Sequence, residues 1–252
     1  MKILLSPAKR LNENLEDISI PLSLPNFLDE SQSLIDILKK NNKNDISDLM
    51  KISKSLSELN YIRFQSWDRK KIIKQGKACV YMFEGDAYKG LNVRNFSDNE
   101  LLALNSKLII LSGLYGILKP FDKILPYRLE MGTKLIHNNG NNLYSFWKDK
   151  LTNYINKELN GEPLVNLASK EYSSVLDFYK IKSNIIQIDF LQEKENQFKN
   201  IAIFSKRARG LMTAYIIKNN IINTEDLKSF DMENYYYNNN LSENNHLVFS
   251  RI

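Results

Sequence analysis

The stretch that decides the fold is KLIILSGLYGILKPFDKILPYRLEMG, which runs from Lys107 to Gly132. Its first residues, up to Leu111, form a short apolar run that predicts a buried strand. The run stops at Ser112 and gives way to a long segment rich in Gly, Pro, Tyr, Arg and Glu. Plain connecting loops are usually shorter, and segments of this kind commonly carry functional side chains. We therefore predict a strand followed by one wall of a site.

Three further apolar runs stop at a serine in the same way. They are KILLS ending at Ser6, LVNLAS ending at Ser169 and IAIFS ending at Ser205. If all four strands run parallel, their carboxyl ends meet at one edge of a sheet, where α/β proteins bind ligands. The alternative is that serine simply ends strands and caps helices. We favour a shared site at this edge.

The remaining hydrophobic pattern predicts helices that alternate with short strands. No domain linker interrupts it, and the length of 252 residues supports one large domain or two small ones. The main predicted elements are helices over Asp45–Gln65, Leu143–Leu159 and Lys206–Asn219, a strand over Ala78–Phe83, and a hairpin with a wide loop made by Ile185–Leu191 and Phe198–Phe204.

Composition and charge narrow the class of protein. The chain is 43% hydrophobic and 25% charged, as in ordinary globular proteins. The apolar run before Ser6 is too short for a signal peptide, and no run approaches the roughly 20 residues of a membrane span. We expect a cytoplasmic protein without a membrane partner. The net charge of +6 fits a polyanionic partner such as nucleic acid, although solvated lysines are the alternative.

The block KRARG, Lys206 to Gly210, places three cations at the predicted start of a helix. There each cation faces the positive end of the helix dipole, at a cost of about 0.3–1 kcal/mol. Gly210 costs about 1 kcal/mol more than alanine in a helix. Local violations of this kind are typical of functional sites. A bound phosphate would reverse the penalty; alternatively, the cations point into water.

The segment after Ser112 and its counterparts after Ser6 and Ser169 supply complementary groups. In an extended chain Arg128 and Glu130 share one face, where Arg128 can fork onto a phosphate and Glu130 can act as a base. A purely structural Arg128–Glu130 pair is the alternative. The candidate phosphate-binding residues of this edge are Lys9, Arg10, Ser112, Tyr115, Arg128, Lys206, Arg207 and Arg209.

Six blocks of the sequence occur in a recognisable order: ILLSPAK (3–9), GDAYKGL (85–91), LSGLYGILKPFDKILPYRLEMG (111–132), LYSFW (143–147), NLASKEY (166–172) and RARGLM (207–212). Together they resemble the YaaA family of bacterial peroxide-stress proteins over essentially the whole chain. The resemblance implies a cytoplasmic, DNA-binding protein that limits free iron and Fenton damage. It also implies a single mixed α/β domain over residues 1–252, with a central mixed sheet, flanking helices and a helix-hairpin-helix element.

That helix-hairpin-helix element is best placed over Ile46–Asn60, with its turn near Lys51-Ile52-Ser53. Backbone N–H groups at such a hairpin hold a DNA phosphate without reading bases, and Lys51 and Lys54 would contact it. Ser53 and Lys54 stand where glycine is expected, which argues against a close approach of the phosphate. The alternatives are one long helix or two packed helices.

The residues argue against direct peroxide or iron chemistry. Cys79, the only cysteine, lies in an apolar run where a thiol stays protonated and unreactive. His137 and His246 are far apart, so no spacing resembles an iron site with two histidines and one carboxylate. A site made only of carboxylates would use Asp86, Glu130 and Glu171. We expect no cofactor and no obligate metal.

Three functions remain open. The favoured one is binding of double-stranded or structured DNA through its phosphates, which predicts strong salt dependence. The second is an enzyme acting on a nucleotide or nucleic acid, with Asp86, Glu130 or Glu171 as acid or base. Carboxylates scattered away from the cations would count against it. The third is iron sequestration or a protein-partner role, which needs carboxylate ligands that converge.

Overall fold

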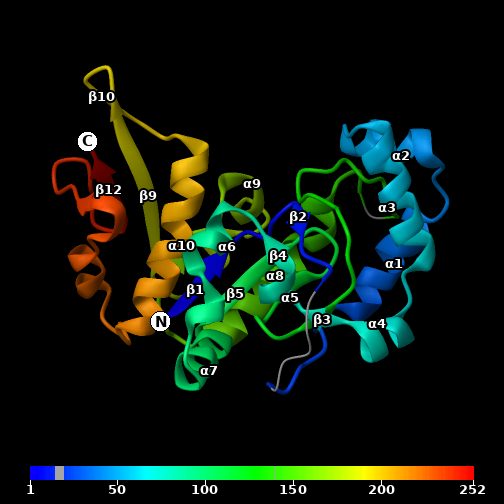
Figure 1. Cartoon of the computed structure of the whole chain (residues 1–252), viewed down its shortest axis with the longest axis horizontal. Coiled ribbons are helices and arrows are strands. Elements are labelled where there is room, and N and C mark those ends of the chain that lie inside the picture. Colours follow the sequence, from blue (N-terminus) through cyan, green and yellow to red (C-terminus); the bar gives the residue numbers. More distant parts are fainter. Residues whose placement is uncertain (15–19, 139) are drawn as a thin grey trace.

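The computed structural model describes residues 1–14, 20–138 and 140–252. Within them a mixed eight-stranded sheet has the order β11-β12-β9-β8-β1-β5-β6, with β10 paired to β9 (Figure 1). The expected mixed α/β class is therefore confirmed. The strands of this sheet are β1 (Lys2–Leu5), β5 (Leu108–Ser112), β6 (Gly116–Leu118), β8 (Leu164–Asn166), β9 (Ile185–Lys194), β10 (Gln197–Lys199), β11 (Tyr236–Tyr237) and β12 (His246–Arg251).

Five neighbouring strands, β12, β9, β8, β1 and β5, run parallel. β1 lies between β8 and β5, and its Ile3 is level with Val165 on one side and Leu108 on the other. From β1 the chain goes to β5 on one side, then returns past β1 to β8 on the other. The strand order thus reverses between β1 and β8. In open α/β sheets such a reversal leaves a crevice beyond the carboxyl ends of the strands, where ligands bind.

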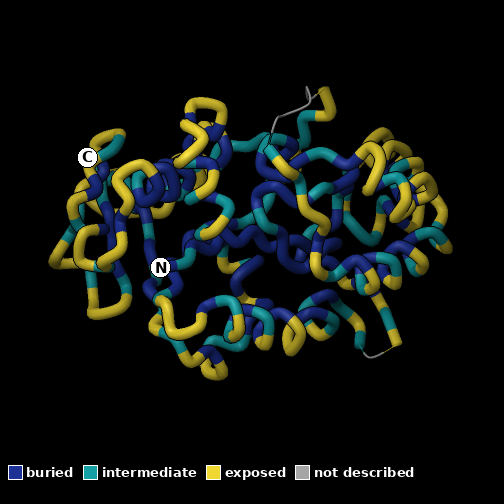
Figure 2. The backbone as a smooth tube through the Cα atoms, turned by 90° about the horizontal axis from the view of Figure 1, so that it is seen from below, coloured by how far each residue is buried: buried dark blue, intermediate teal, exposed yellow. Residues whose placement is uncertain are grey.

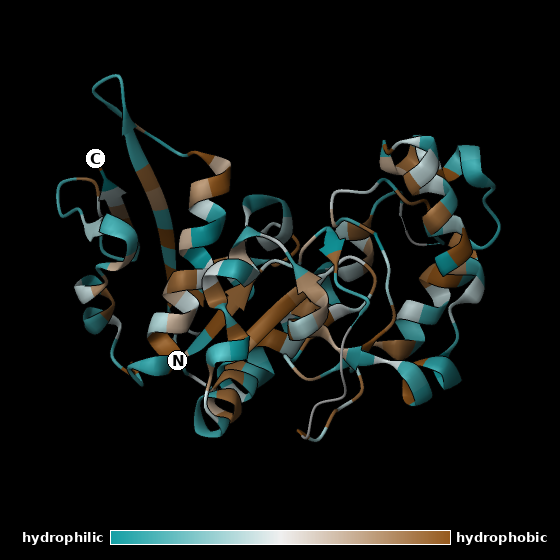
Figure 3. Ribbon diagram, viewed as in Figure 1, coloured by the Kyte–Doolittle hydropathy of each residue, from teal (hydrophilic) through white to brown (hydrophobic). Residues whose placement is uncertain are grey.

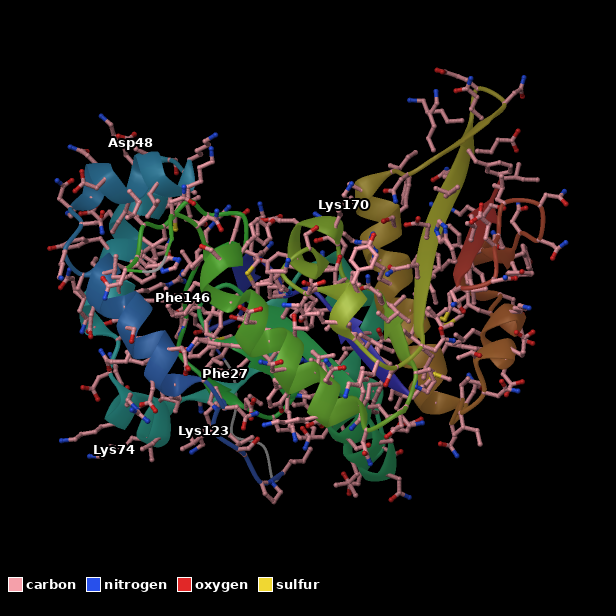
Figure 4. The ribbon with its side chains drawn as sticks, turned by 180° about the vertical axis from the view of Figure 1, so that it is seen from behind. Phe27, Asp48, Lys74, Lys123, Phe146 and Lys170 are labelled. Carbon is pink, nitrogen blue, oxygen red and sulfur yellow. The ribbon has the colours of Figure 1, made fainter. Side chains whose placement is uncertain are left out.

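Helices cover both faces of the sheet, as parallel strands require. α10 (Ala202–Lys218), α6 (Asp86–Leu91) and α7 (Asp98–Lys107) lie on the face seen in Figure 1. α8 (Leu143–Leu159), which carries Phe146, lies on the other face, seen from behind in Figure 4. The helix predicted over Leu143–Leu159 is therefore confirmed. Leu143, Trp147 and Leu151, each four residues apart, form part of its buried stripe.

A group of helices forms one end of the molecule, at the right of Figure 1. They are α1 (Leu28–Leu38), α2 (Lys43–Met50), α3 (Lys54–Ser66) and α4 (Arg69–Gln75). α2 ends at Lys51, which adopts a left-handed conformation with φ of 52°, and the Ser53 side chain caps α3. One long helix over Asp45–Gln65 is therefore wrong: two helices are joined by the turn expected near residues 51–53.

Short elements complete the described chain. Two small sheets pair β2 (Arg10–Leu11) with β4 (Phe83–Glu84) and β3 (Lys77–Ala78) with β7 (Lys123–Ile124). The short helices are α5 (Cys79–Met82), α9 (Lys170–Ser173), η1 (Val93–Asn95), η2 (Phe178–Lys180), η3 (Thr224–Ser229) and η4 (Met232–Asn234).

The buried apolar residues form one continuous cluster. It follows the strands through the middle of the molecule, as the buried tube in Figure 2 and the hydrophobic strands in Figure 3 show. Trp67, Tyr115 and Trp147 are among its largest fully buried side chains. Their polar atoms are bonded, since Trp67 Nε1 donates to Tyr115 Oη at 3.1 Å and Trp147 Nε1 donates to the Gly113 carbonyl at 3.0 Å. The core is thus specified by hydrogen bonds as well as by packing.

The strand predicted over Ala78–Phe83 is wrong. Residues 79–82 form the helical turn α5, and the backbone N–H groups of Cys79 and Val80 donate to the carbonyls of Asp122 and Pro120. Short apolar runs do not distinguish a buried strand from a buried helical turn by their pattern alone. Cys79 remains fully buried, as a core role requires, and burial raises its pKa well above the ordinary thiol value.

The hairpin predicted after Ile185 is right in kind and wrong in extent. β9 continues to Lys194, and its turn is tight because Glu195 and Asn196 have φ of 55° and 57°, the left-handed pair typical of a two-residue hairpin turn. β10 ends at Lys199, and α10 begins at Ala202. The IAIFS run therefore belongs to a helix rather than to a fourth strand that ends at a serine.

Candidate functional site

A pocket of about 360 Å³ opens where the strand order reverses. Its walls come from the loop after β1, the β4–α6 junction, the segment after β8 and one face of α10. These segments are far apart in the sequence and meet beyond the carboxyl ends of β1 and β8. We call this the switch-point pocket. Its position is the one that ligand sites take in open α/β sheets.

Two of the serines that end strands meet in this pocket. The backbone N–H of Ser169 donates to Ser6 Oγ at 2.9 Å, and Ser6 Oγ is 3.3 Å from Ser169 Oγ. Tyr88 Oη donates to the carbonyl of Ser6 at 3.1 Å. The loop after β1 is thus held from two sides, which keeps the base of the pocket rigid.

The three cations of the basic block on α10 do not all belong to the pocket. Lys206 and Arg209, three residues apart, share one helix face and line the pocket. Arg207 does not line the pocket, and its Nε donates to Glu233 Oε1 at 2.7 Å. Because α10 starts at Ala202, the cations lie beyond its first residues. The predicted placement of these cations at a helix start is therefore wrong.

Arg209 is the most unusual cation of the pocket. Its Nε atom is buried and has no hydrogen-bond partner among the described residues. Burial lowers the pKa of its guanidinium, and the charge of Asp189 partly opposes this shift. Asp189 itself is paired with His246 Nε2 at 2.9 Å. Arg209 therefore lines the pocket without an ion pair of its own among the described residues, and Asp189 is the carboxylate whose charge acts on it.

Gly210 and Gly90 allow α10 and α6 to cross closely. A Cβ atom at residue 210 would lie 1.7 Å from the Ala87 carbonyl oxygen, and one at residue 90 would lie 2.2 Å from the Arg207 carbonyl oxygen. Gly210 is therefore explained by packing and needs no bound phosphate. The close crossing fixes the start of α6, with Asp86, beside the cations of α10.

The other predicted cations of this edge are paired with carboxylates. Arg10 lines the pocket, and its Nε lies 2.9 Å from Glu84 Oε2. Lys9 also lines the pocket and makes an ion pair with Glu130, which in turn pairs with Arg128 Nη2 at 3.0 Å. Arg128 and Glu130 do not themselves line the pocket. Arg128 and Glu130 thus form the purely structural ion pair that was the alternative to phosphate binding and base catalysis, and Lys9 links this pair to the pocket.

Two of the three candidate carboxylates line the switch-point pocket. Asp86 is the first residue of α6, and Glu171 is the second residue of α9, whose N-cap is Ser169. Glu171 Oε1 accepts a hydrogen bond from the Gly132 N–H at 3.3 Å. Carboxylates and cations therefore share one cavity. The arrangement offers both phosphate-binding groups and acid or base groups to a ligand.

The remaining predicted residues lie elsewhere. Ser112 is buried, bonded to Tyr127 Oη at 2.6 Å and to the Tyr115 N–H at 2.9 Å. Tyr115 is buried as well, so we leave both out of the contact set proposed below. Lys51 and Lys54 lie at the exposed turn between α2 and α3, at the end of the molecule away from α10 (Figure 1).

Sequence reasoning missed the contribution of the β4–α6 junction. Glu84, Tyr88 and Lys89 all line the pocket. Tyr88 and Lys89 lie within the block GDAYKGL, which carries the family resemblance, but nothing in its local pattern connects it to α10. The connection depends on the close helix crossing, whose only signal in the sequence is the pair of glycines.

Metal ligands do not converge in the part of the chain that the structure describes: it contains no group of three or more His, Cys, Asp or Glu side chains suited to a metal ion. The two histidines have other contacts. His137 Nε2 lies 3.1 Å from Ser145 Oγ, and His246 pairs with Asp189. Of the described helices, none has the length and apolar character needed to cross a membrane.

These features define a mixed α/β protein with a charged pocket at the reversal point of its sheet. Residues 1–241 match the family model described as peroxide stress protein YaaA, and the chain belongs to that family. It is 44% identical to a UPF0246 protein of Flavobacterium psychrophilum over 252 residues, and 42% identical to one of Legionella pneumophila over 256 residues, with 100% of each chain covered. A Marinomonas UPF0246 protein is 43% identical, with 100% of this chain and 97% of that protein covered. The family resemblance is thus confirmed.

Proposed function

We propose that this cytoplasmic member of the peroxide stress family binds double-stranded or structured DNA through its phosphates at the switch-point pocket. The observation that carries the proposal is the set of cations lining one cavity: Lys9, Arg10, Lys89, Lys206 and Arg209. Lys89, Lys206 and Arg209 make no ion pair within the described residues, so their charge is available to a polyanion. Cations at a concave site concentrate the field and attract anionic partners.

Phosphate binding links this site to peroxide protection. Duplex DNA carries a condensed layer of counterions, and a protein that neutralises phosphates releases them. Iron(II) held at the phosphates would be released in the same way. Because Fenton chemistry damages DNA where iron is bound to it, a protein that occupies the phosphates limits that damage without a metal site or a reactive thiol of its own.

The turn between α2 and α3 offers a second phosphate contact. Lys51 and Lys54 flank this exposed turn, and Ser53 caps the helix that follows. Backbone N–H groups at the start of α3 add the favourable end of its dipole. In this proposal the turn acts as the helix-hairpin-helix element and contacts the DNA backbone beyond the pocket.

An enzyme acting on a nucleotide or nucleic acid is the second candidate. Asp86 and Glu171 line the same cavity as the cations, whereas pure backbone binding needs no carboxylates there. A carboxylate beside bound phosphate can serve as a general acid or base. A screen for release of phosphate or base from oligonucleotides, with Asp86→Asn and Glu171→Gln as matched variants, tests this function. Loss of a measured turnover in either variant would support it.

DNA binding is tested by fluorescence anisotropy of a short labelled duplex across a salt series. The variant Lys89→Gln/Lys206→Gln removes two pocket cations that make no ion pair within the described residues. We expect weaker binding and a log–log salt slope shallower by about two, since each lost phosphate contact lowers the slope by about 0.9. The matched control Lys157→Gln/Arg207→Gln removes two charges outside the pocket. Equal effects of the two variants, or no binding by the wild type at low salt, would contradict the proposal.

A further inference from the structure

The size of the switch-point pocket limits what can enter it. Its volume of about 360 Å³ is that of a small-molecule site, since such sites span about 300–1,000 Å³. A DNA duplex cannot enter, because even its major groove is about 12 Å wide. DNA can therefore lie across the rim of the pocket, while the interior accommodates only a single unit of a nucleic acid or a free small molecule.

Arg209 can bind the anionic end of such a ligand. Arg209 lines the pocket, its Nε is buried without a hydrogen-bond partner among the described residues, and Asp189 is hydrogen-bonded to His246. A buried charged donor that lacks a hydrogen bond is more costly than a neutral one, so a ligand that supplies an acceptor is favoured. A phosphate matches the planar fork of a guanidinium better than any neutral group does. Lys206, one helical turn earlier, adds a second cation.

The rest of the lining suits more than a bare phosphate. Tyr88, Tyr172 and Leu167 are among the residues that line the pocket. The Tyr88 ring is held in place by its hydrogen bond to the Ser6 carbonyl. Aromatic and apolar walls of this kind bind the faces of bases. Asp86 is an acceptor for hydroxyl or amino groups and would repel a free phosphate.

We propose that the switch-point pocket binds one nucleotide unit, with its phosphate on Arg209 and Lys206, its base against the tyrosine-lined wall, and a sugar hydroxyl or base amino group on Asp86. This inference rests on the proposed function, because it names what enters the pocket when DNA lies at its rim. The unit comes either from a free nucleotide or from an unpaired nucleotide of DNA. Extruding such a nucleotide is easiest where it is already mismatched or single-stranded.

Titration calorimetry with nucleoside 5′-monophosphates, and with inorganic phosphate alone, tests the inference. We expect Arg209→Gln to weaken monophosphate binding by about tenfold or more, which corresponds to at least about 1.4 kcal/mol. Arg207→Gln, two residues away and outside the pocket, should leave it unchanged. Asp86→Asn is less disruptive to the fold than a change at Arg209, and it should weaken nucleotide binding while leaving phosphate binding equal or tighter.

A comparison of two DNA duplexes separates the two sources. In the anisotropy assay, a duplex with one unpaired nucleotide should bind more tightly than a fully paired duplex of equal length, and Arg209→Gln should remove that difference. If the wild type prefers the duplex with the unpaired nucleotide, Arg209→Gln removes this preference and mononucleotides do not bind, the inference is supported with DNA as the source. Mononucleotide binding without such a preference supports it with a free nucleotide as the source. If the wild type binds the paired duplex but shows neither mononucleotide binding nor the preference for an unpaired nucleotide, the inference is overturned and the proposed function stands. If the wild type binds no DNA at all, the proposed function is overturned.

Discussion

The backbone N–H of Ser169 donates a hydrogen bond to Ser6 Oγ at 2.9 Å, and this bond joins the loops after β1 and β8. The two strands are neighbours in the sheet, on either side of the point where the strand order reverses. The bond therefore ties together the two sides of the crevice that the topology creates. The switch-point pocket is built on this link.

Ser6→Ala should lower the free energy of unfolding by about 0.5–1.5 kcal/mol, the usual net value of a hydrogen bond. It should also weaken DNA binding, because the loop that carries Lys9 and Arg10 loses its anchor. Urea unfolding measures the first effect and anisotropy the second. Ser33→Ala is the matched control, since Ser33 is exposed and its hydroxyl donates to the Asp29 carbonyl one turn earlier in α1. Equal behaviour of the two variants would show that the Ser6–Ser169 bond does not organise the site.

Gly210→Ala should destabilise the protein by about 1–3 kcal/mol or more, as overpacking does. The added Cβ would lie 1.7 Å from the Ala87 carbonyl oxygen, so α6 and α10 must separate. Thermal or urea unfolding measures the cost. Ile203→Ala, at an exposed position of the same helix, should stay within about 0.5 kcal/mol of the wild type. A stabilised Gly210→Ala variant would mean that the helices do not cross as closely as described.

Tyr115→Phe should lower the free energy of unfolding by about 1–3 kcal/mol, because two buried donors lose their acceptor. They are Trp67 Nε1 at 3.1 Å and the Leu125 N–H at 3.2 Å. Duplex affinity should remain unchanged at temperatures where the variant is folded. The control is Tyr179→Phe, whose hydroxyl is fully exposed. A loss of DNA affinity in the folded Tyr115→Phe variant would return Tyr115 to the contact set.

Asp122 should make stability depend on pH. Burial raises the pKa of its carboxyl above the ordinary value of 3.8, although hydrogen bonds from Ser23 and the Lys119 N–H oppose the shift. The native state therefore holds this proton at a pH where the unfolded chain has released it. The contribution of Asp122 to the free energy of unfolding should fall as pH rises from 3.8 through the raised pKa.

Urea unfolding at a series of pH values, comparing the wild type with Asp122→Asn, measures that contribution. The stability of the wild type relative to the variant should decrease with rising pH and then level off. Asp48→Asn, at an exposed position of α2, should give a curve parallel to that of the wild type. A wild-type advantage that grows as pH rises through this range would show that the pKa of Asp122 is lowered in the folded state.

The sequence predicted those parts of the fold that depend on local pattern. The stripe of α8 and the strands that end near Ser6, Ser112 and Ser169 are set by apolar periodicity. The start of α10 was missed because its first turn, with exposed Ile203 and Phe204, has the composition of a strand. Its helical state depends on packing against α6, and that contact lies more than a hundred residues away in the sequence.

The sequence predicted the candidate site only in part. Lys9, Arg10, Lys206 and Arg209, with Asp86 and Glu171, line one pocket because parallel strands bring their carboxyl ends together. Arg207 could not be separated from Arg209 while the helix start was misplaced. Arg128 and Glu130 were placed on one face correctly, but their ion pair and the link to Lys9 depend on tertiary contacts.

The most direct test of the central claim is photo-cross-linking of the wild-type protein to a short duplex that carries 4-thiothymidine, followed by mass mapping of the modified peptides. Our account predicts cross-links in the segments that form the switch-point pocket, residues 5–10, 84–89 and 167–172 and the start of α10. Further cross-links at the turn around residues 51–54 would fit the second proposed contact. Cross-links that exclude the pocket segments would contradict the claim that DNA is bound there.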